Sequence, residues 1–153
     1  MKLSYPFVLA ISLVFAASSR AEDTTAVASA AKPAVAAVVE FSTALQAGDL
    51  KRVEGLLDPN VLVLEGGNAE HSRAEYLTKH AGADAAFLKK VHVMVKRRSA
   101  RIDGNLAYVT TESDMHLVEG GKMQTIPSTE TMVLQKVGEG WRIVHIHWSS
   151  QSK

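Results

Sequence analysis

Hydrophobic residues recur at helical spacing in the first third of the chain. Pro33 suits the first turn of a helix, and valine, phenylalanine and leucine side chains fill one side of the segment that follows, up to Gly48. Glycine at that position can end a helix. Asp49 is placed to cap a second helix, whose apolar positions also repeat every three or four residues until Asp58-Pro59 stops it. The pattern predicts two successive helices.

A short strand and further helical segments follow. Val61–Glu65 has the pattern of a strand. Ser72 and Glu75 form a capping box that opens a third helix. We expect Gly82 to end this helix and a further turn or short helix to cover Ala83–Phe87.

The second half of the chain alternates long β-patterned runs with glycine-containing turns. Asp103-Gly104 is a strong signal for a two-residue hairpin. The four strands predicted here are Val91–Ile102, Leu106–Val118, Met123–Val137 and Trp141–Ser150. Helices, a strand, a helix and then a four-stranded antiparallel meander describe an α+β fold and not a βαβ fold.

Turn type decides which side chains of the meander share a face. A three-residue turn with Gly140 in the left-handed conformation pairs Val137 with Trp141, and a two-residue turn at Gly120-Gly121 extends the same register to the preceding strand. The face expected toward the helices is then apolar apart from one carboxylate, and it includes Thr111, Glu130, Met132, Val144, Ile146 and Trp148.

The remaining hairpin disagrees with this alternation. Its simple register turns Lys96 and Arg98 inward and the valines of 91–95 outward. A β-bulge in one of its two strands would restore the apolar face, as strongly bent sheets often require. The bulge is expected between Val91 and Val118.

The N-terminus has the pattern of an export signal. Lys2 provides a positive start, Phe7–Ala17 is apolar but too short to span a bilayer, and Ser19-Arg20-Ala21 places small residues at a cleavage site. We expect residues 1–21 to be a signal peptide and the protein to be periplasmic or secreted.

The rest of the chain suits one domain. Removing 21 of 153 residues leaves 132, and the 17 basic residues fall to 15 against 16 acidic ones because Lys2 and Arg20 are lost. Residues 22–32 are expected to form a disordered tether and 33–150 the folded domain. A charge near zero predicts neither nucleic-acid binding nor membrane association after cleavage. The absence of cysteine excludes thiol catalysis and disulfides.

The last two strands resemble a known fold. The Glu130–Leu134 run, a glycine turn and the aromatic and imidazole side chains of the last strand resemble the closing hairpin of the nuclear transport factor 2-like, or SnoaL-like, superfamily. The resemblance covers Pro33–Ser150 and implies a cone-shaped, curved antiparallel sheet with helices on its concave face. Such a cup serves many unrelated functions, so the fold does not name a reaction.

The closing hairpin is also similar to that of the calcium/calmodulin-dependent kinase association domain. The matching positions are Glu130-Thr131, Val133, Trp141, Val144-His145, His147 and Ser149. That family has a pocket arginine directly after Glu-Thr, and here the position is Met132. The departure argues against an anionic ligand held as in that family. No tyrosine and aspartate pair of the steroid isomerase branch is recognised.

Two residues are candidates for acid–base catalysis. Glu130 on an apolar wall is expected to have a raised pKa, and His80 on the third helix could carry a proton near neutral pH. The alternative is that Glu130 is structural, hydrogen-bonded to Thr111, Ser128 or the Trp148 indole. Tyr76 lies four residues before His80 and shares its helix face, and the two could close the mouth of the cup.

Three classes of function remain open. A pocket for a small apolar or amphipathic molecule, with ligand contacts from Tyr76, Thr111, Met132 and Trp148, is favoured by the apolar wall and needs no cofactor. An acid–base enzyme of isomerase, cyclase or hydrolase type is the alternative. A metal site at His145 and His147 is the third, although the polar face that carries them also suits a homodimer interface.

Overall fold

The computed structural model describes Val27 and residues 29–151, and the expected signal peptide lies outside these residues. Within the expected tether, Ser29–Ala31 forms a short 3-10 helix, η1, and Ala31 is buried in the core. No helix of the described residues is long and apolar enough to cross a membrane.

Four α-helices precede the meander, and their ends follow from local chemistry. Gly48 ends the first helix in the left-handed conformation (φ 76°), and the Asp49 side chain caps the second by accepting from the Arg52 backbone. Ser72 caps the third, as the capping box predicts. The helices are α1 (Lys32–Ala47), α2 (Leu50–Leu56), α3 (Arg73–Lys79) and α4 (Ala81–Leu88).

Two details of the helical region differ from the sequence analysis. Gly82 does not end the third helix, which stops at Lys79, and it lies inside α4 instead. Leu57 belongs to the first strand and not to the second helix, because its buried side chain packs in the sheet opposite Ile143.

The six strands form one mixed sheet in the order β2-β1-β6-β5-β4-β3. The four-stranded meander is antiparallel as predicted, while β1 runs parallel to the last strand and carries the short β2 at the edge. The strands are β1 (Leu57–Glu65), β2 (Asn68–Glu70), β3 (Val91–Asp103), β4 (Leu106–Glu119), β5 (Lys122–Val137) and β6 (Gly140–Ser150).

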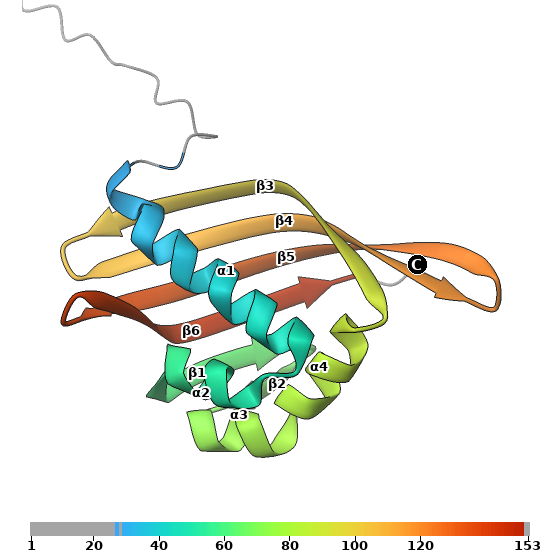
Figure 1. The fold of residues 1–153 in the computed structure, drawn as a ribbon, viewed down its shortest axis with the longest axis horizontal. Helices are drawn as coiled ribbons and strands as arrows, with labels where there is room; N and C mark the ends of the chain where they lie inside the picture. Colours follow the sequence, from blue (N-terminus) through green and yellow to red (C-terminus); the bar gives the residue numbers. More distant parts are fainter. Residues whose placement is uncertain (1–26, 28, 152–153) are drawn as a thin grey trace, which may run out of the picture.

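The helices cover one face of the curved sheet. Figure 1 shows α1 crossing the face of the meander strands, with α2, α3 and α4 grouped beside β1 and β2. The core between the layers includes Phe41, Leu45, Met132 and Ile146, all at most 1% exposed. The β4–β5 hairpin extends beyond the other strands at one end (Figure 1). The α+β cone predicted from the sequence is confirmed.

The register of the closing hairpin is correct near the cup and wrong near the turn. Glu130 pairs with Trp148, as expected, but Val137 pairs with Gly140, and Gly138 rather than Gly140 has positive φ (59°). The turn has two residues, which shifts the register by one position, and a bulge at Val144 shifts it back. Val133 and the residues before it on β5 therefore pair as expected. Ile143 is therefore fully buried in the place expected for Val144, which is half-buried.

The bulge expected in the first hairpin is confirmed. The register shifts between Val95 and Arg97, so Lys96 is the extra residue, and its ammonium group binds Asp114 at 2.9 Å. After the bulge, Arg98 faces inward opposite Thr111. Before the bulge, Val93 and Val95 also face inward, so both sides of the bulge contribute to the concave face.

Candidate functional site

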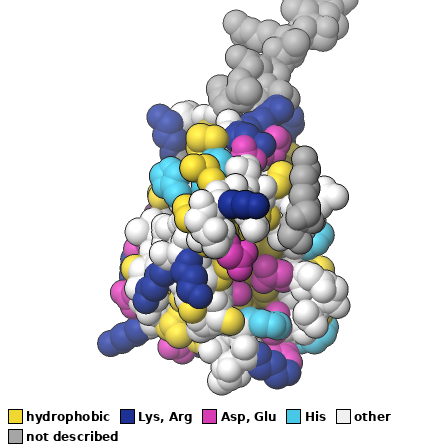
Figure 2. Space-filling model, turned by 90° about the vertical axis from the view of Figure 1, so that its right-hand side faces the viewer, with side chains coloured by type: hydrophobic (Ala, Val, Ile, Leu, Met, Phe, Trp, Pro, Cys, Tyr) yellow, Lys and Arg dark blue, Asp and Glu magenta, His cyan; other side chains and the backbone are white. Residues whose placement is uncertain are grey.

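A cavity of about 340 Å³ lies between the C-terminal half of α1, α4 and the concave face of the sheet. Its helical walls carry the apolar residues Phe41, Leu45, Phe87 and Leu88, together with the polar residues Ser42, Thr43, Gln46 and Asp84. Figure 2 looks at the end of the molecule toward which the β4–β5 hairpin extends, where acidic side chains gather near the middle of the face beside hydrophobic ones.

One transverse line of residues forms the floor of the cavity, and we call it the central row. Strand pairing places its members side by side on β3, β4, β5, β6 and β1. In that order they are Arg98, Thr111, Glu130, Trp148 and Glu65, and all five line the cavity. Residues of the next line toward the core, such as Val109 and Met132, are fully buried. The central row is therefore where the core meets the cavity.

The next line on the other side carries hydroxyls on β4, β5 and β6. Ser113, Ser128 and Ser150 pair with one another across β4, β5 and β6, and all three line the cavity. We call this the serine row. Ser113 is only 8% exposed. On β4, β5 and β6 the floor thus passes from the central row, which carries Glu130, to the hydroxyls of the serine row.

Two hydrogen bonds fix the central row. The Nε atom of Arg98 donates to the Thr111 hydroxyl at 3.1 Å, and the indole Nε1 of Trp148 donates to Glu130 Oε2 at 2.9 Å. The Trp148 ring lies 6.3 Å from Phe41 and 6.2 Å from Tyr76, measured between ring centroids. Packing against the core thereby fixes the Trp148 ring, and the indole hydrogen bond orients the Glu130 carboxylate.

Carboxyl groups gather at the β1 end of the central row. Glu65 and Asp84 both line the cavity, and burial raises the pKa of each above its ordinary value. The Asp84 and Glu70 carboxylates raise the pKa of Glu65 further, whereas His80 opposes the increase. The Tyr76 hydroxyl donates to Asp84 Oδ2 at 2.9 Å and lowers its pKa in part. Burial therefore favours the protonated form of both Glu65 and Asp84.

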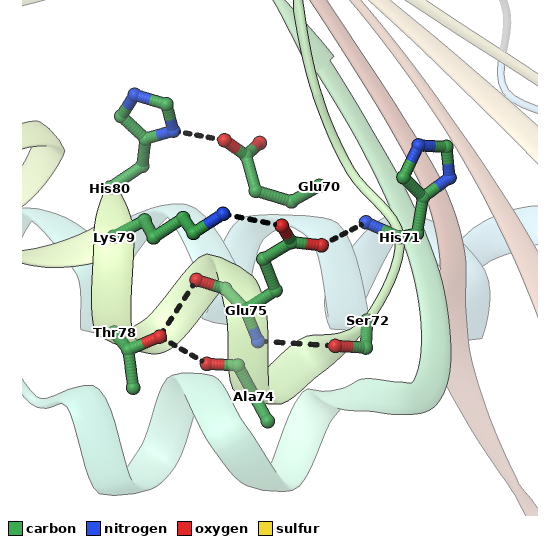
Figure 3. A network of polar contacts seen from close by, with 8 residues as sticks. All are labelled: Glu70, His71, Ser72, Ala74, Glu75, Thr78, Lys79 and His80. Carbon is green, nitrogen blue, oxygen red and sulfur yellow. Dashed lines mark hydrogen bonds and ion pairs between the residues drawn. The ribbon is translucent and has the colours of Figure 1, made fainter.

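A polar network lies around α3, outside the cavity lining (Figure 3). His80 pairs through Nδ1 with Glu70, which is 3% exposed. Glu75 accepts from the His71 backbone at 2.8 Å and binds Lys79 at 2.6 Å. These contacts fix the turn between β2 and α3 and the start of α4, which carries Asp84.

The residues predicted to form the site are only partly together. Thr111, Glu130 and Trp148 line the cavity, while Met132 and Tyr76 are fully buried in the core next to it. His80 does not line the cavity, and Tyr76 does not close its mouth. The catalytic and ligand-binding roles assigned from the sequence stay predictions.

The two histidines of the last strand lie elsewhere. His145 and His147 occupy the same face of β6, where His145 Nδ1 contacts the Leu62 carbonyl at 3.1 Å and His147 is exposed. Among the described residues no three or more His, Asp or Glu side chains are placed to hold a metal ion.

Sequence reasoning missed Arg98, Asp84 and the serine row as site residues. The signal for Arg98 was present, because the simple hairpin register turned it inward, but the unlocated bulge hid its meaning. Asp84 gave no sequence signal, since its place depends on how α4 packs against the sheet.

The SnoaL-like domain model matches residues 34–152, and the chain belongs to this family. Among solved structures, a protein from Shewanella frigidimarina, named provisionally as a ketosteroid isomerase, is 37% identical over 74% of this chain and 92% of its own, with a TM-score of 0.70. The CaMKII hub of S. rosetta is 23% identical over 82% and 100% of the two chains, with a TM-score of 0.67. None of the curated proteins matches the chain.

A further solved structure has the same fold. A dehydratase of the NTF2-like family from Streptomyces avermitilis, also named provisionally, is 18% identical over 81% and 97% of the two chains, with a TM-score of 0.65. The superfamily resemblance stated from the sequence is confirmed. The chain is a SnoaL-like domain with the NTF2-like, cystatin-like fold.

Proposed function

We propose that this domain binds a small amphipathic organic molecule in its cavity. The observation that carries the proposal is the cavity itself, which has about 340 Å³ of space between the apolar side chains of α1 and α4 and the polar central row. Small-molecule sites are typically concave and mostly apolar, with a few convergent polar groups that orient the ligand. The apolar part would lie against Phe41 and Phe87, and the polar part would lie on the floor.

Mass spectrometry of the natively purified protein tests the proposal. We expect a retained organic molecule whose mass disappears on denaturation. The Ser128→Trp variant, which places an indole in the cavity, is expected to lose the molecule while keeping its fold by circular dichroism. Equal retention by both proteins would place the molecule outside the cavity and contradict the proposal.

An acid–base reaction of isomerase type is the second candidate, and Glu65 favours it. This half-buried carboxyl group lines the cavity with a raised pKa, which suits a general acid or base. Glu130, the first candidate from the sequence, is bonded to Trp148, and His80 is paired with Glu70 outside the lining. The similarity to the Shewanella protein supports the same class of reaction.

A β,γ-unsaturated ketosteroid, whose conversion to the conjugated ketone is followed by ultraviolet absorbance, tests the second candidate. If Glu65 moves the proton, Glu65→Gln should lower turnover ~10²–10⁴-fold while binding survives. Equal turnover by Glu65→Gln and the unchanged protein would remove Glu65 from the reaction.

We also propose that the protein is exported and acts in the periplasm or outside the cell. Support comes from the charged start, the short apolar run and the small residues that end at Ala21. The mass of the protein recovered from a periplasmic extract should correspond to a chain that begins at Glu22. An intact Met1 on the extracted protein would contradict cleavage at this position.

A further inference from the structure

Arg98 and Glu130 face the same cavity from the same row, yet they do not bind each other. Thr111 stands between them on β4, and among the described residues no ion pair joins the guanidinium to the carboxylate. Each is held instead by a neutral neighbour: Arg98 by Thr111 and Glu130 by Trp148. The floor therefore presents a separated positive and negative charge.

Both groups keep hydrogen-bonding atoms for a ligand. Arg98 uses Nε for Thr111, which leaves the two terminal nitrogens of its guanidinium, the part that binds a carboxylate in a fork. Glu130 uses Oε2 for Trp148, which leaves Oε1 as an acceptor. Neither remaining set makes a side-chain hydrogen bond within the described part of the chain.

The groups beside the two charges favour ligand groups of opposite charge. On the Arg98 side, Ser113 lies next to Thr111 on the same face of β4, is 8% exposed, and makes no side-chain hydrogen bond among the described residues. A hydroxyl there can donate to an oxyanion. On the Glu130 side, the row continues through Trp148 to Glu65, with Asp84 also in the lining. That side favours a cation.

Resting on the proposed function, we propose that the ligand is a bipolar molecule: a carboxylate bound by Arg98, an ammonium group bound by Glu130, and an apolar spacer between them. Adjacent strands lie about 5 Å apart, so the two side chains start roughly 10 Å apart. The chain of an ω-amino acid such as 6-aminohexanoate covers a comparable span. A simple anion would leave Glu130 without a counterion, and a simple cation would leave Arg98 without one.

Isothermal titration calorimetry with four molecules of one chain length tests this inference on the unchanged protein: 6-aminohexanoate, hexanoate, hexylamine and 1-hexanol. We expect 6-aminohexanoate to bind at least about tenfold more tightly than each of the other three, the scale of one charge-assisted hydrogen bond. Hexanoate or hexylamine binding as tightly as 6-aminohexanoate would overturn the inference.

Two variants assign the ends. Arg98→Met should weaken binding of 6-aminohexanoate about tenfold and leave hexylamine within about twofold, because only the carboxylate loses its partner. Glu130→Gln should weaken 6-aminohexanoate similarly and leave hexanoate within about twofold. Arg142→Met and Glu139→Gln are the matched controls, since they remove a positive and a negative charge outside the cavity lining. Both variants should bind 6-aminohexanoate as the unchanged protein does. Equal losses in these controls would overturn the assignment.

The outcomes separate this inference from the proposed function. Saturable binding of 1-hexanol with no gain from either charged group would overturn the bipolar ligand and leave the cavity as a site for amphipathic molecules. Absence of saturable binding by all four molecules would overturn both. The comparison of the four molecules needs no variant, so it stands even where a substitution prevents folding.

Discussion

At the scale of single residues, Trp148 connects the core to the cavity. Its ring packs near Phe41 and Tyr76, and its indole nitrogen holds the Glu130 carboxylate. The same side chain therefore contributes burial to the fold and orientation to the floor of the site. This indole is one of the partners predicted for a structural Glu130, and the hydrogen bond is present.

Trp148→Phe should lower the free energy of unfolding by about 1–3 kcal/mol. The change keeps an aromatic ring but leaves a part-buried carboxylate without its donor. Urea denaturation followed by circular dichroism measures the effect. Trp141→Phe is the matched control and should cost less, because the Trp141 indole makes no side-chain hydrogen bond within the described part of the chain. Equal costs for the two variants would show that the indole hydrogen bond contributes nothing.

Glu65→Gln should make the fold more stable near neutral pH. Burial raises the pKa of Glu65 above its ordinary value of 4.5, so the folded state penalises the charged form. Stability that depends on this group is present at low pH and is lost as pH rises from the unfolded pKa through the folded pKa. The gain should be greatest near pH 7 and disappear below about pH 4, as measured by urea denaturation at both values. Glu139→Gln, in an exposed turn, should show no such pH dependence.

At the scale of the elements, the sequence predicted three turns and the alternation of inward and outward side chains along the strands. It did not predict every local irregularity of the sheet. Glycines marked where the hairpins close, and the apolar positions of β4 and β5 fixed the face that meets the helices. The disrupted alternation of the first hairpin predicted a bulge there, but neither its position at Lys96 nor the second bulge at Val144 had a local signal. The three-residue β2 is too short to have a pattern of its own.

Ser72→Ala should lower the free energy of unfolding by about 1 kcal/mol. The Ser72 hydroxyl accepts from the Glu75 backbone at 3.1 Å and satisfies one free donor at the start of α3. Thermal and urea denaturation measure the loss. Thr78→Ala is the control, since it removes an exposed hydroxyl of the same helix that bonds only to carbonyls of the preceding turn. A larger cost for Thr78→Ala would contradict the capping role.

At the scale of the whole molecule, the cavity needs contacts that sequence patterns do not supply. Successive hairpin registers bring Thr111, Glu130 and Trp148 together, and these were predicted as site residues. The addition of Glu65 requires the parallel pairing of β1 with β6, which joins distant parts of the chain. The position of Asp84 in the cavity depends on how α4 packs against the sheet. The polar half of the floor was therefore only partly predictable.

We expect the protein to form a homodimer through the outer face of its sheet. That face carries polar and imidazole side chains, including the stacked pair His92 and His116, and in Figure 1 the helices lie on the opposite face. Light scattering at tens of micromolar should give twice the mass of one chain, and the mass of a single chain would contradict this expectation.

Emission from Trp148 tests ligand binding in the cavity most directly. In the Trp141→Phe protein, Trp148 is the one remaining tryptophan of the chain, and it lines the cavity. Titration with 1-octanol should shift its emission to the blue and saturate, because the ligand removes water from the indole. The Trp148→Phe protein should show no such shift. A shift that rises linearly without saturation, or one that is equal in both proteins, would contradict a ligand site in this cavity.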